Sequence, residues 1–208
     1  MTMRQLRSAT PLVLAVAAVT LVAPAVAWAQ AGGGGSKTAA PAPATAPTPM
    51  GPPKPNPALE QELKFFAGDW QCAGTGYVEA KGHPTSAKVH AAWELNNFFL
   101  GVRYEEQQTE VNPMPVTAVE HWGYGDELKK LVAGQVDSMG GYGTQATAGW
   151  EGDRLVWVGD YHWMGTKMPS RDTFVRRGAN ELTHLGELQA KGAWTKLDEE
   201  TCYRLGSR

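Results

Sequence analysis

The sequence has few cysteines and lacks the motifs that mark common catalytic sites. Its 2 cysteines, Cys72 and Cys202, stand too far apart to follow a zinc-ligand spacing. None of the 5 histidines forms a His-x-x-x-His pair, and no serine lies in a G-x-S-x-G turn. No glycine-rich loop precedes a helix, so a phosphate-binding loop is not indicated. These absences argue against zinc, serine-hydrolase and nucleotide-binding classes, and we expect no metal site.

A basic surface is also lacking. All 21 acidic residues fall within 58–208, together with 15 of the 19 basic residues, so this region carries a net charge of −6 (15 − 21). Nucleic-acid-binding domains carry the opposite sign. We therefore expect no nucleic-acid partner. No stretch after Ala29 is long and apolar enough to cross a membrane.

Residues 1–29 have the pattern of a signal peptide. Arg4 and Arg7 precede the apolar run PLVLAVAAVTLVAPAVA, and the AWA at 27–29 is a small-x-small cleavage site. Cleavage before Gln30 would release a secreted or periplasmic protein. The alternative is an uncut membrane anchor, which the shortness of the apolar run disfavours.

The mature chain divides into a linker and one domain. Residues 30–57 are almost entirely Gly, Ala, Pro, Thr and Ser, which cannot bury a core, so we expect a disordered tether. Residues 58–208 are long enough for one domain that buries roughly 68–70% of its unfolded surface.

The pattern of this domain predicts one short helix followed by strands. Leu59, Leu63 and Phe66 recur at helical spacing, and Asn56-Pro57 is suited to start the helix. After Gly68 apolar residues alternate with period two, and Asn- and Gly-rich turns recur. We expect about ten antiparallel strands, near 70–79, 86–95, 98–108, 115–124, 129–137, 142–150, 154–163, 168–177, 181–189 and 194–204. With no second helix, the fold is all-β, either a sandwich or a closed barrel.

The cysteines favour a closed barrel. If the first strand pairs with the last so that residue numbers sum to 274, Cys72 faces Cys202 and Trp70 faces Arg204. Both pairs then point to one side of the sheet, because side chains alternate along a strand. In an oxidising compartment such opposed cysteines form a disulfide. Two unpaired buried thiols are the alternative.

The same residues carry a resemblance to known families. Gly68-Asp69-Trp70 resembles the G-x-W motif of lipocalins and other calycins, whose tryptophan packs at the closed end of the barrel beneath an arginine of the last strand. The resemblance implies this closing role for Trp70 and Arg204.

From Leu63 to Arg204 the chain more closely resembles a bacterial family, domain of unknown function family 1579. The stretches that carry this resemblance are LKFFAGDW, NNFFLGVRYEE, HWGYGDELKKLVAGQVDSMG, GWEGDRLVWVG and RDTFVRRG. It implies a calycin-like, up-and-down β-barrel and no particular activity.

Aromatic residues gather on one face of the predicted strands. If this face points inward, it predicts a ligand pocket with Glu120 and His184 as polar anchors and a wall of Trp93, Tyr104, Trp122, Tyr124, Trp157, Tyr161 and Trp163. A wall residue such as Trp122 would be packed on one side only. Alternatively, the aromatics fill the core, His184 is a hydrogen-bonded core histidine, or a bulge turns Glu120 to solvent.

Three functions fit these patterns. The favoured hypothesis is an exported protein that binds a small, partly aromatic or hydrophobic ligand inside the barrel. Haem is one variant, although no histidine stands out as its axial ligand, and the cofactor stays unknown. The second hypothesis is a hydrolase or isomerase with Glu120 or His184 as the base. The third is a structural or interaction module with a filled core. Oligomeric state is not predicted.

Overall fold

The computed structural model describes residues 51–78 and 81–206, so the predicted signal peptide and most of the predicted linker lie outside the described residues. Within these ranges one α-helix precedes eleven strands. The elements are α1 (Pro57–Leu63), β1 (Gly68–Val78), β2 (Lys81–Glu94), the 3-10 turn η1 (Leu95–Asn97), β3 (Phe99–Glu106), β4 (Thr117–Gly125), β5 (Lys130–Asp137), β6 (Tyr142–Thr147), β7 (Trp150–Glu151), β8 (Arg154–Trp163), β9 (Thr166–Arg176), β10 (Glu181–Ala190) and β11 (Ala193–Arg204).

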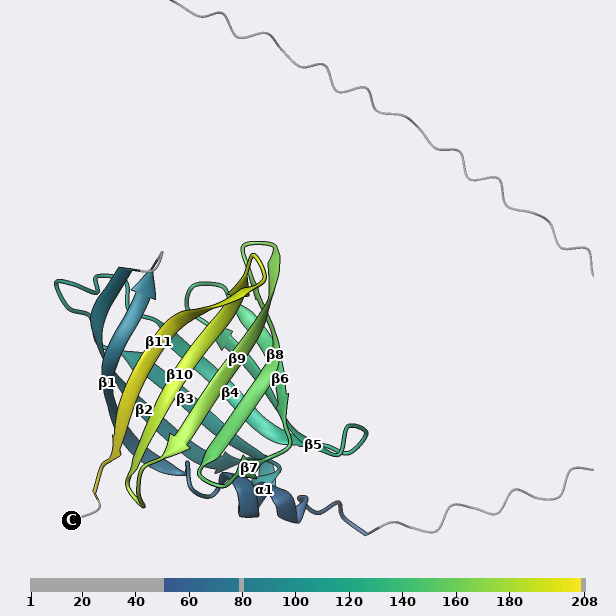
Figure 1. Cartoon of the computed structure of the whole chain (residues 1–208). Coiled ribbons are helices and arrows are strands. Elements are labelled where there is room, and N and C mark those ends of the chain that lie inside the picture. Colours follow the sequence, from purple (N-terminus) through teal and green to yellow (C-terminus); the bar gives the residue numbers. More distant parts are fainter. Residues whose placement is uncertain (1–50, 79–80, 207–208) are drawn as a thin grey trace, which may run out of the picture. The chain divides into compact units, whose positions relative to one another are not determined.

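Ten of these strands close into an antiparallel barrel (Figure 1). From β1 to β6 and from β8 to β11 each strand pairs with the next one in sequence, β6 pairs with β8, and β1 pairs with β11 to complete the ring. β7 pairs only with β8 and lies outside the ring. The predicted all-β, up-and-down barrel is confirmed and the sandwich is excluded. Among the described strands, closure leaves no long edge free to pair with another chain.

The register between β1 and β11 is the predicted one. Trp70 pairs with Arg204 and Cys72 pairs with Cys202. The two cysteines form a disulfide, so the alternative of two free thiols is wrong. The first and last strands of the barrel are therefore joined covalently as well as by hydrogen bonds.

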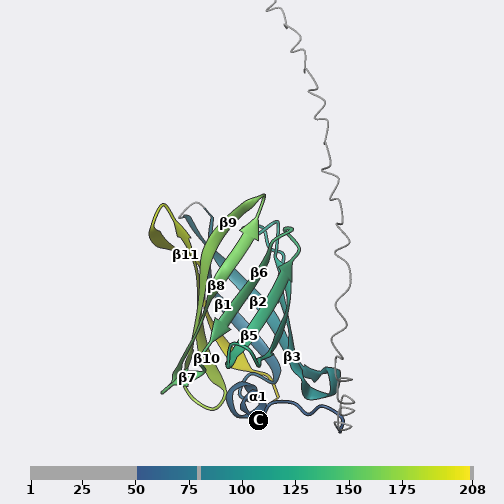
Figure 2. The same cartoon turned by 90° about the vertical axis from the view of Figure 1, so that its right-hand side faces the viewer.

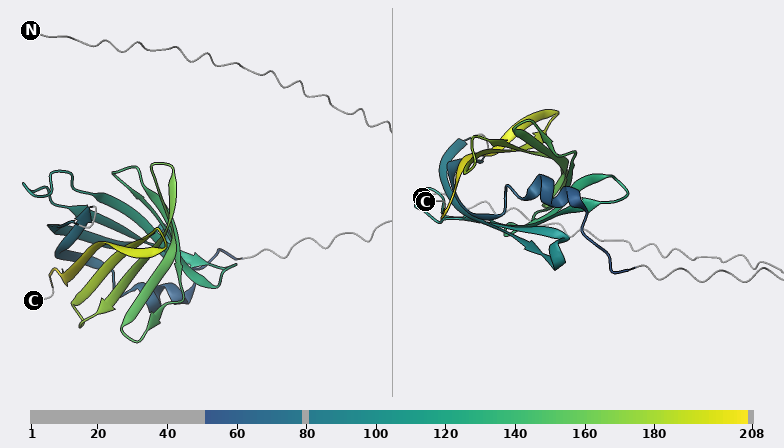
Figure 3. Two further views of the ribbon diagram at one scale, coloured as in Figure 1. Left: turned by 45° about the horizontal axis from the view of Figure 1, so that its top comes forward. Right: turned by 90° about the horizontal axis from the view of Figure 1, so that it is seen from below.

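The helix α1 lies across one end of the barrel (Figure 3). The side chain of Asn56 caps it by accepting a hydrogen bond from the backbone N of Ala58 at 3.0 Å, and Pro57 opens its first turn, as the sequence predicts. Leu59 and Leu63 are buried, and Phe66 follows them into the core. The helix therefore closes this end with its apolar face.

One predicted strand is divided in two. Residues 142–150 were expected to form a single strand, but β6 ends at Thr147 and Trp150 belongs to β7. The cause lies in α1: Glu62 accepts hydrogen bonds from the backbone N of Trp150 at 3.0 Å and from its Nε1 at 2.7 Å. Gly149 turns the chain with a φ of 106°, and a Cβ there would lie 2.7 Å from a carboxylate oxygen of Glu62.

The closed end is packed with aromatic rings. The ring of Phe66 lies 4.9 Å from that of Trp122, 5.5 Å from that of Trp150 and 5.2 Å from that of Phe174, measured between centroids. The hairpin turns after β5, β8 and β10 lie at the opposite end (Figure 2). The barrel therefore has an apolar floor above α1. Among the described residues, no helix is of the length and apolarity that a membrane span requires.

Candidate binding cavity in the barrel

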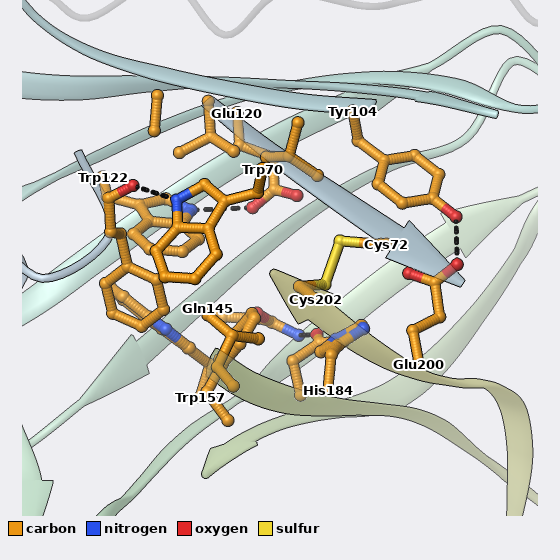
Figure 4. A pocket seen from close by; sticks show the side chains of 17 residues that line it. Trp70, Cys72, Tyr104, Glu120, Trp122, Gln145, Trp157, His184, Glu200 and Cys202 are labelled. Carbon is orange, nitrogen blue, oxygen red and sulfur yellow. Dashed lines mark hydrogen bonds and ion pairs between the residues drawn. A yellow bond between two sulfur atoms is a disulfide. The ribbon is translucent and has the colours of Figure 1, made fainter. Parts of the chain in front are cut away.

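A cavity of about 100 Å³ lies inside the barrel, above the aromatic floor (Figure 4). It is lined by side chains from nine strands and by Phe66, which follows α1. The apolar lining consists of Phe66, Trp70, Cys72, Val89, Ala91, Val102, Trp122, Trp157, Phe174, Leu182 and Cys202. The polar lining consists of Tyr104, Glu120, Gln145, Asp172, His184 and Glu200. The cavity thus combines an aromatic wall with a concentrated set of ionisable groups.

The aromatic wall is itself well packed. Trp122 is 3% exposed, and its ring lies 5.2 Å from that of Trp157 and 5.8 Å from that of Phe174. With Phe66 below it, Trp122 is supported by rings on several sides. The expectation that it would be packed on one side only is therefore wrong, although it does line the cavity.

His184 on β10 lies between two carboxylates from neighbouring strands. Its Nε2 is 3.0 Å from Oδ1 of Asp172 on β9, and its Nδ1 is 3.0 Å from Oδ1 of Asp198 on β11. The amide of Gln145 donates to Oδ2 of Asp172 at 2.5 Å and to the hydroxyl of Ser170 at 3.1 Å. This hydrogen-bonded chain fixes the position of the imidazole ring.

The absence of a side chain at Gly186 allows this arrangement. Gly186 pairs with Asp172 on one side and with Asp198 on the other, two residues beyond His184. A Cβ at Gly186 would lie 2.7 Å from Oδ2 of Asp198 and 3.3 Å from Oδ1 of Asp172. Both carboxylates therefore fill the space above the glycine and reach His184.

The pair of carboxylates keeps His184 charged. Burial disfavours the imidazolium, but the negative charges and hydrogen bonds of Asp198 and Asp172 raise the pKa of His184 well above its usual value of 6.5. At neutral pH this histidine is therefore a cation with both ring nitrogens engaged. It is a poor general base in that state.

Glu200 is a second buried acid in the cavity. It is 5% exposed, and its Oε1 accepts hydrogen bonds from the hydroxyls of Tyr104 at 2.9 Å and Thr85 at 3.2 Å. Burial and the nearby charge of Asp198 raise its pKa, although His184 and the two hydroxyls oppose the shift. The hydroxyls hold this carboxylate in place on β11 without neutralising it.

Glu120 faces the cavity from β4, so no bulge turns it to solvent. Its Oε2 accepts a hydrogen bond of 2.7 Å from Nε1 of Trp122. Burial raises the pKa of Glu120 to about 7, and this bond lowers it only in part. Glu120 is therefore divided between its acid and carboxylate forms near neutral pH.

Trp157 leaves one polar group in the cavity wall without a partner. The side chain is 1% exposed, and no described residue accepts a hydrogen bond from its Nε1. A buried N–H without an acceptor costs on the order of 1–3 kcal/mol.

The predicted pocket residues divide by their depth in the barrel. Tyr104, Glu120, Trp122, Trp157 and His184 come together around the cavity. Four others do not line it. Trp93 and Tyr124 pack against the core at the end closed by α1, whereas Tyr161 and Trp163 lie toward the opposite end.

The two residues at the far end have other partners. The hydroxyl of Tyr161 donates to Oδ2 of Asp137 at 2.6 Å, and Nε1 of Trp163 donates to the carbonyl of Met139 at 3.1 Å. The two bonds tie β8 to the last residue of β5 and to the turn that follows it. Period-two alternation predicted the face of these residues but not their height along the barrel.

Sequence reasoning missed Gln145, Asp172, Asp198 and Glu200. The signal for the last two was present, because the register that places Cys202 and Arg204 inside gives Asp198 and Glu200 the same parity. Asp172 likewise shares the parity of Phe174. Charged residues are rarely buried unless they are paired, so parity alone does not indicate that an acidic residue lies inside the barrel. The position of His184 between Asp172 and Asp198 accounts for the inward orientation of these two carboxylates.

One group of these residues has the donor atoms for a metal ion. Single ligand atoms of His184, Asp198 and Glu200 lie within 4.8 Å of one another. A metal at His184 Nδ1 would have to displace Asp198 from that nitrogen. Cys72 and Cys202 lie close to Glu200, but their sulfur atoms are used in the disulfide.

Comparison with known proteins yields a likeness in fold. No protein-family model matches the chain, and no curated protein matches it. Among solved structures, the crystal structure of Rv2717c from M. tuberculosis is similar, with a TM-score of 0.56 and 13% sequence identity. The match covers 73% of this chain and 99% of that chain. At this identity the chain shares a fold with Rv2717c.

Proposed function

We propose that the protein binds a small, partly hydrophobic molecule inside the barrel, and that it does so after export from the cytoplasm. The Cys72–Cys202 disulfide supports an oxidising compartment, and the signal-peptide pattern of residues 1–29 supports export to the periplasm or beyond. We also propose membership of domain of unknown function family 1579, on the sequence stretches described above.

The convergence of Glu120, His184 and Glu200 on one aromatic cavity is the observation that carries the binding proposal. Filled cores satisfy their buried polar groups internally. Here the carboxyl groups of Glu120 and Glu200 and the charged imidazole of His184 face the same space, beside an aromatic surface, and Oε2 of Glu200 accepts no hydrogen bond from the described residues. Convergent polar groups in an apolar cavity are typical of ligand sites.

The size of the cavity limits the occupant. A volume of about 100 Å³ is smaller than the engineered apolar cavity of ~150 Å³ that accepts benzene. We therefore expect a compact molecule, or the compact end of a longer one that extends toward the open end of the barrel.

The test is mass spectrometry of small molecules that copurify with the full chain under native conditions. Val102 lines the cavity from β3, so Val102→Phe should fill part of it and reduce the amount of bound molecule at least about tenfold. Val119→Phe is the matched control, because Val119 precedes Glu120 on β4 and has the opposite parity. The control should keep the wild-type amount. Equal amounts in both variants would contradict binding in this cavity.

A second candidate function is acid–base catalysis in the same cavity. The observation that favours it is the contact of His184 with Asp172 and Asp198, together with Glu120 whose pKa is about 7. In this arrangement Glu120 would accept a proton and cationic His184 would supply one. The charge of His184 makes Glu120, rather than His184, the base.

Acetone is a probe small enough for this test. A general base at Glu120 would exchange its methyl protons for deuterium in D₂O faster than buffer alone, as measured by proton NMR. Glu120→Gln should abolish the excess rate, and Glu94→Gln, on the exposed part of β2, should keep it. Exchange at the buffer rate with the wild-type protein would contradict this candidate for carbonyl substrates.

A further inference from the structure

The interior of the barrel carries more negative than positive groups. Four carboxylates point into it, from Glu120, Asp172, Asp198 and Glu200, and His184 is the ionisable group that opposes them. Among the described residues, no lysine or arginine lines the cavity. We refer to these four groups as the interior carboxylates.

Hydrogen bonds position the interior carboxylates but do not balance their charge. Asp172 and Asp198 share one imidazolium, and Glu200 is bonded to two neutral hydroxyls at its Oε1. Its other oxygen, Oε2, accepts no hydrogen bond from the part of the chain that the structure describes. Buried charge without a counter-charge is costly, so a cation in the cavity would be stabilised by more than contact alone.

On the basis of the proposed binding function, we infer that the occupant is a small organic cation. This cation is a protonated amine that lies between the interior carboxylates and the aromatic wall. Glu200 and Asp198 supply the counter-charge. Trp122, Trp157 and Phe174 supply apolar surface, and aromatic rings also attract cations through their π faces.

Two further observations support an organic ammonium over a bare metal ion. Both nitrogens of His184 already contact carboxylates at 3.0 Å, so a metal would have to break one of these contacts. The aromatic lining offers no ligand atoms to a small hydrated metal ion, whereas it can pack against the alkyl part of an alkylammonium group.

The raised pKa values agree with this charge imbalance. Burial raises the pKa of Glu120 to about 7, and burial together with Asp198 raises that of Glu200. Both acids therefore take up protons more readily than an exposed carboxyl group does. A bound cation would favour their charged forms.

The test compares three probes of similar size and different charge: tert-butylamine as its ammonium ion, tert-butanol and propionate. Each is titrated into the full-length protein, and binding is followed by NMR through the indole N–H resonance of Trp157, assigned from a Trp157→Phe spectrum. We expect the ammonium ion to bind at least about tenfold more tightly than tert-butanol, and propionate not to bind.

Glu200→Gln tests the source of the preference. Glutamine keeps an oxygen for Tyr104 and Thr85 but removes the charge, so ammonium affinity should fall about tenfold while tert-butanol affinity stays the same. Glu199→Gln is the matched control, because the neighbouring Glu199 contacts Tyr77 and Lys196 and does not line the cavity. Circular dichroism verifies that both variants are folded. The probe comparison in the wild-type protein stands even if Glu200→Gln does not fold.

The outcomes separate this inference from the function on which it rests. If tert-butanol binds as tightly as the ammonium ion, the cation preference is wrong and binding in the cavity stands. If none of the three probes shifts the Trp157 resonance, both proposals fail. If Zn²⁺ shifts it, requires Glu200 and excludes the ammonium ion, the site belongs to a metal and the organic cation is overturned.

Discussion

The guanidinium carbon of Arg204 lies 4.2 Å from the ring centroid of Trp70, its partner across the closing pair of strands. The same guanidinium donates hydrogen bonds of 2.5 Å to the carbonyls of Phe65 and Ala67. Trp70 in turn donates from Nε1 to the carbonyl of Phe66 at 2.8 Å. Two side chains thus join the first strand, the last strand and the segment that leads out of α1.

Replacing Arg204 should weaken the closed end of the barrel. Arg204→Ala removes two charge-assisted hydrogen bonds and the cation–π contact, and we expect a loss of about 2–4 kcal/mol of unfolding free energy. Urea denaturation followed by tryptophan fluorescence measures it. Arg103→Ala provides the control, because Arg103 is in an exposed pair with Glu105 and should cost less than about 1 kcal/mol. Equal losses in the two variants would contradict a closing role for Arg204.

The Cys72–Cys202 disulfide should contribute strongly to stability. It encloses 130 positions of the chain, and for a loop of this length the entropic model gives on the order of 4–5 kcal/mol as an upper figure. We expect the Cys72→Ala/Cys202→Ala variant to unfold at a much lower urea concentration than the wild type. Peptide mapping without reductant identifies the bond in the exported protein. Recovery of both cysteines as free thiols would show that it does not form there.

Trp122→Ala should destabilise the fold as well as the cavity. Because Trp122 is packed by Phe66, Trp157 and Phe174, its truncation should cost about 3–5 kcal/mol, as for other buried aromatic residues. Trp194→Ala is the control, since that residue is 37% exposed and the guanidinium of Arg171 lies over its ring at 4.4 Å. Chemical denaturation compares the two. A loss below about 1 kcal/mol for Trp122→Ala would mean that its packing is loose.

Stability should fall as pH rises through the acidic range because of Glu120. Its pKa is about 7 in the folded protein against an ordinary 4.5, so between these values the folded state holds the proton more tightly than the unfolded state. The contribution of Glu120 to stability is fully present below about pH 4.5. It is lost as the pH rises toward 7, which lowers the free energy of unfolding by up to about 3 kcal/mol.

Glu120→Gln isolates this contribution. The variant keeps an oxygen for Nε1 of Trp122 but cannot titrate, so its stability should depend less on pH between 4.5 and 7 than that of the wild type. His184 acts in a higher window, because its raised pKa lets stability fall only above its ordinary value of 6.5. Parallel pH profiles for wild type and Glu120→Gln would refute the shift at Glu120.

The sequence by itself determined the register and the inward face of the first and last strands. Side chains alternate with period two, so one correct pairing, Cys72 with Cys202, placed Trp70 and Arg204 on the same side and closed the barrel. The export-type N-terminus made a disulfide the expected chemistry for that pair. Asn56 and Pro57 also predicted the start of α1, because helix capping depends on local residues.

Only the tertiary structure decided the depth of each residue and the partners of each charge. Trp93 and Trp157 share a predicted face, yet one packs at the closed end and the other lines the cavity, because strand tilt and stagger set height along the axis. His184 became an imidazolium because a bare glycine position, Gly186, lets Asp172 and Asp198 approach from the strands on either side. Such contacts depend on the relative positions of three neighbouring strands. The alternation of side chains within a single strand therefore cannot predict them.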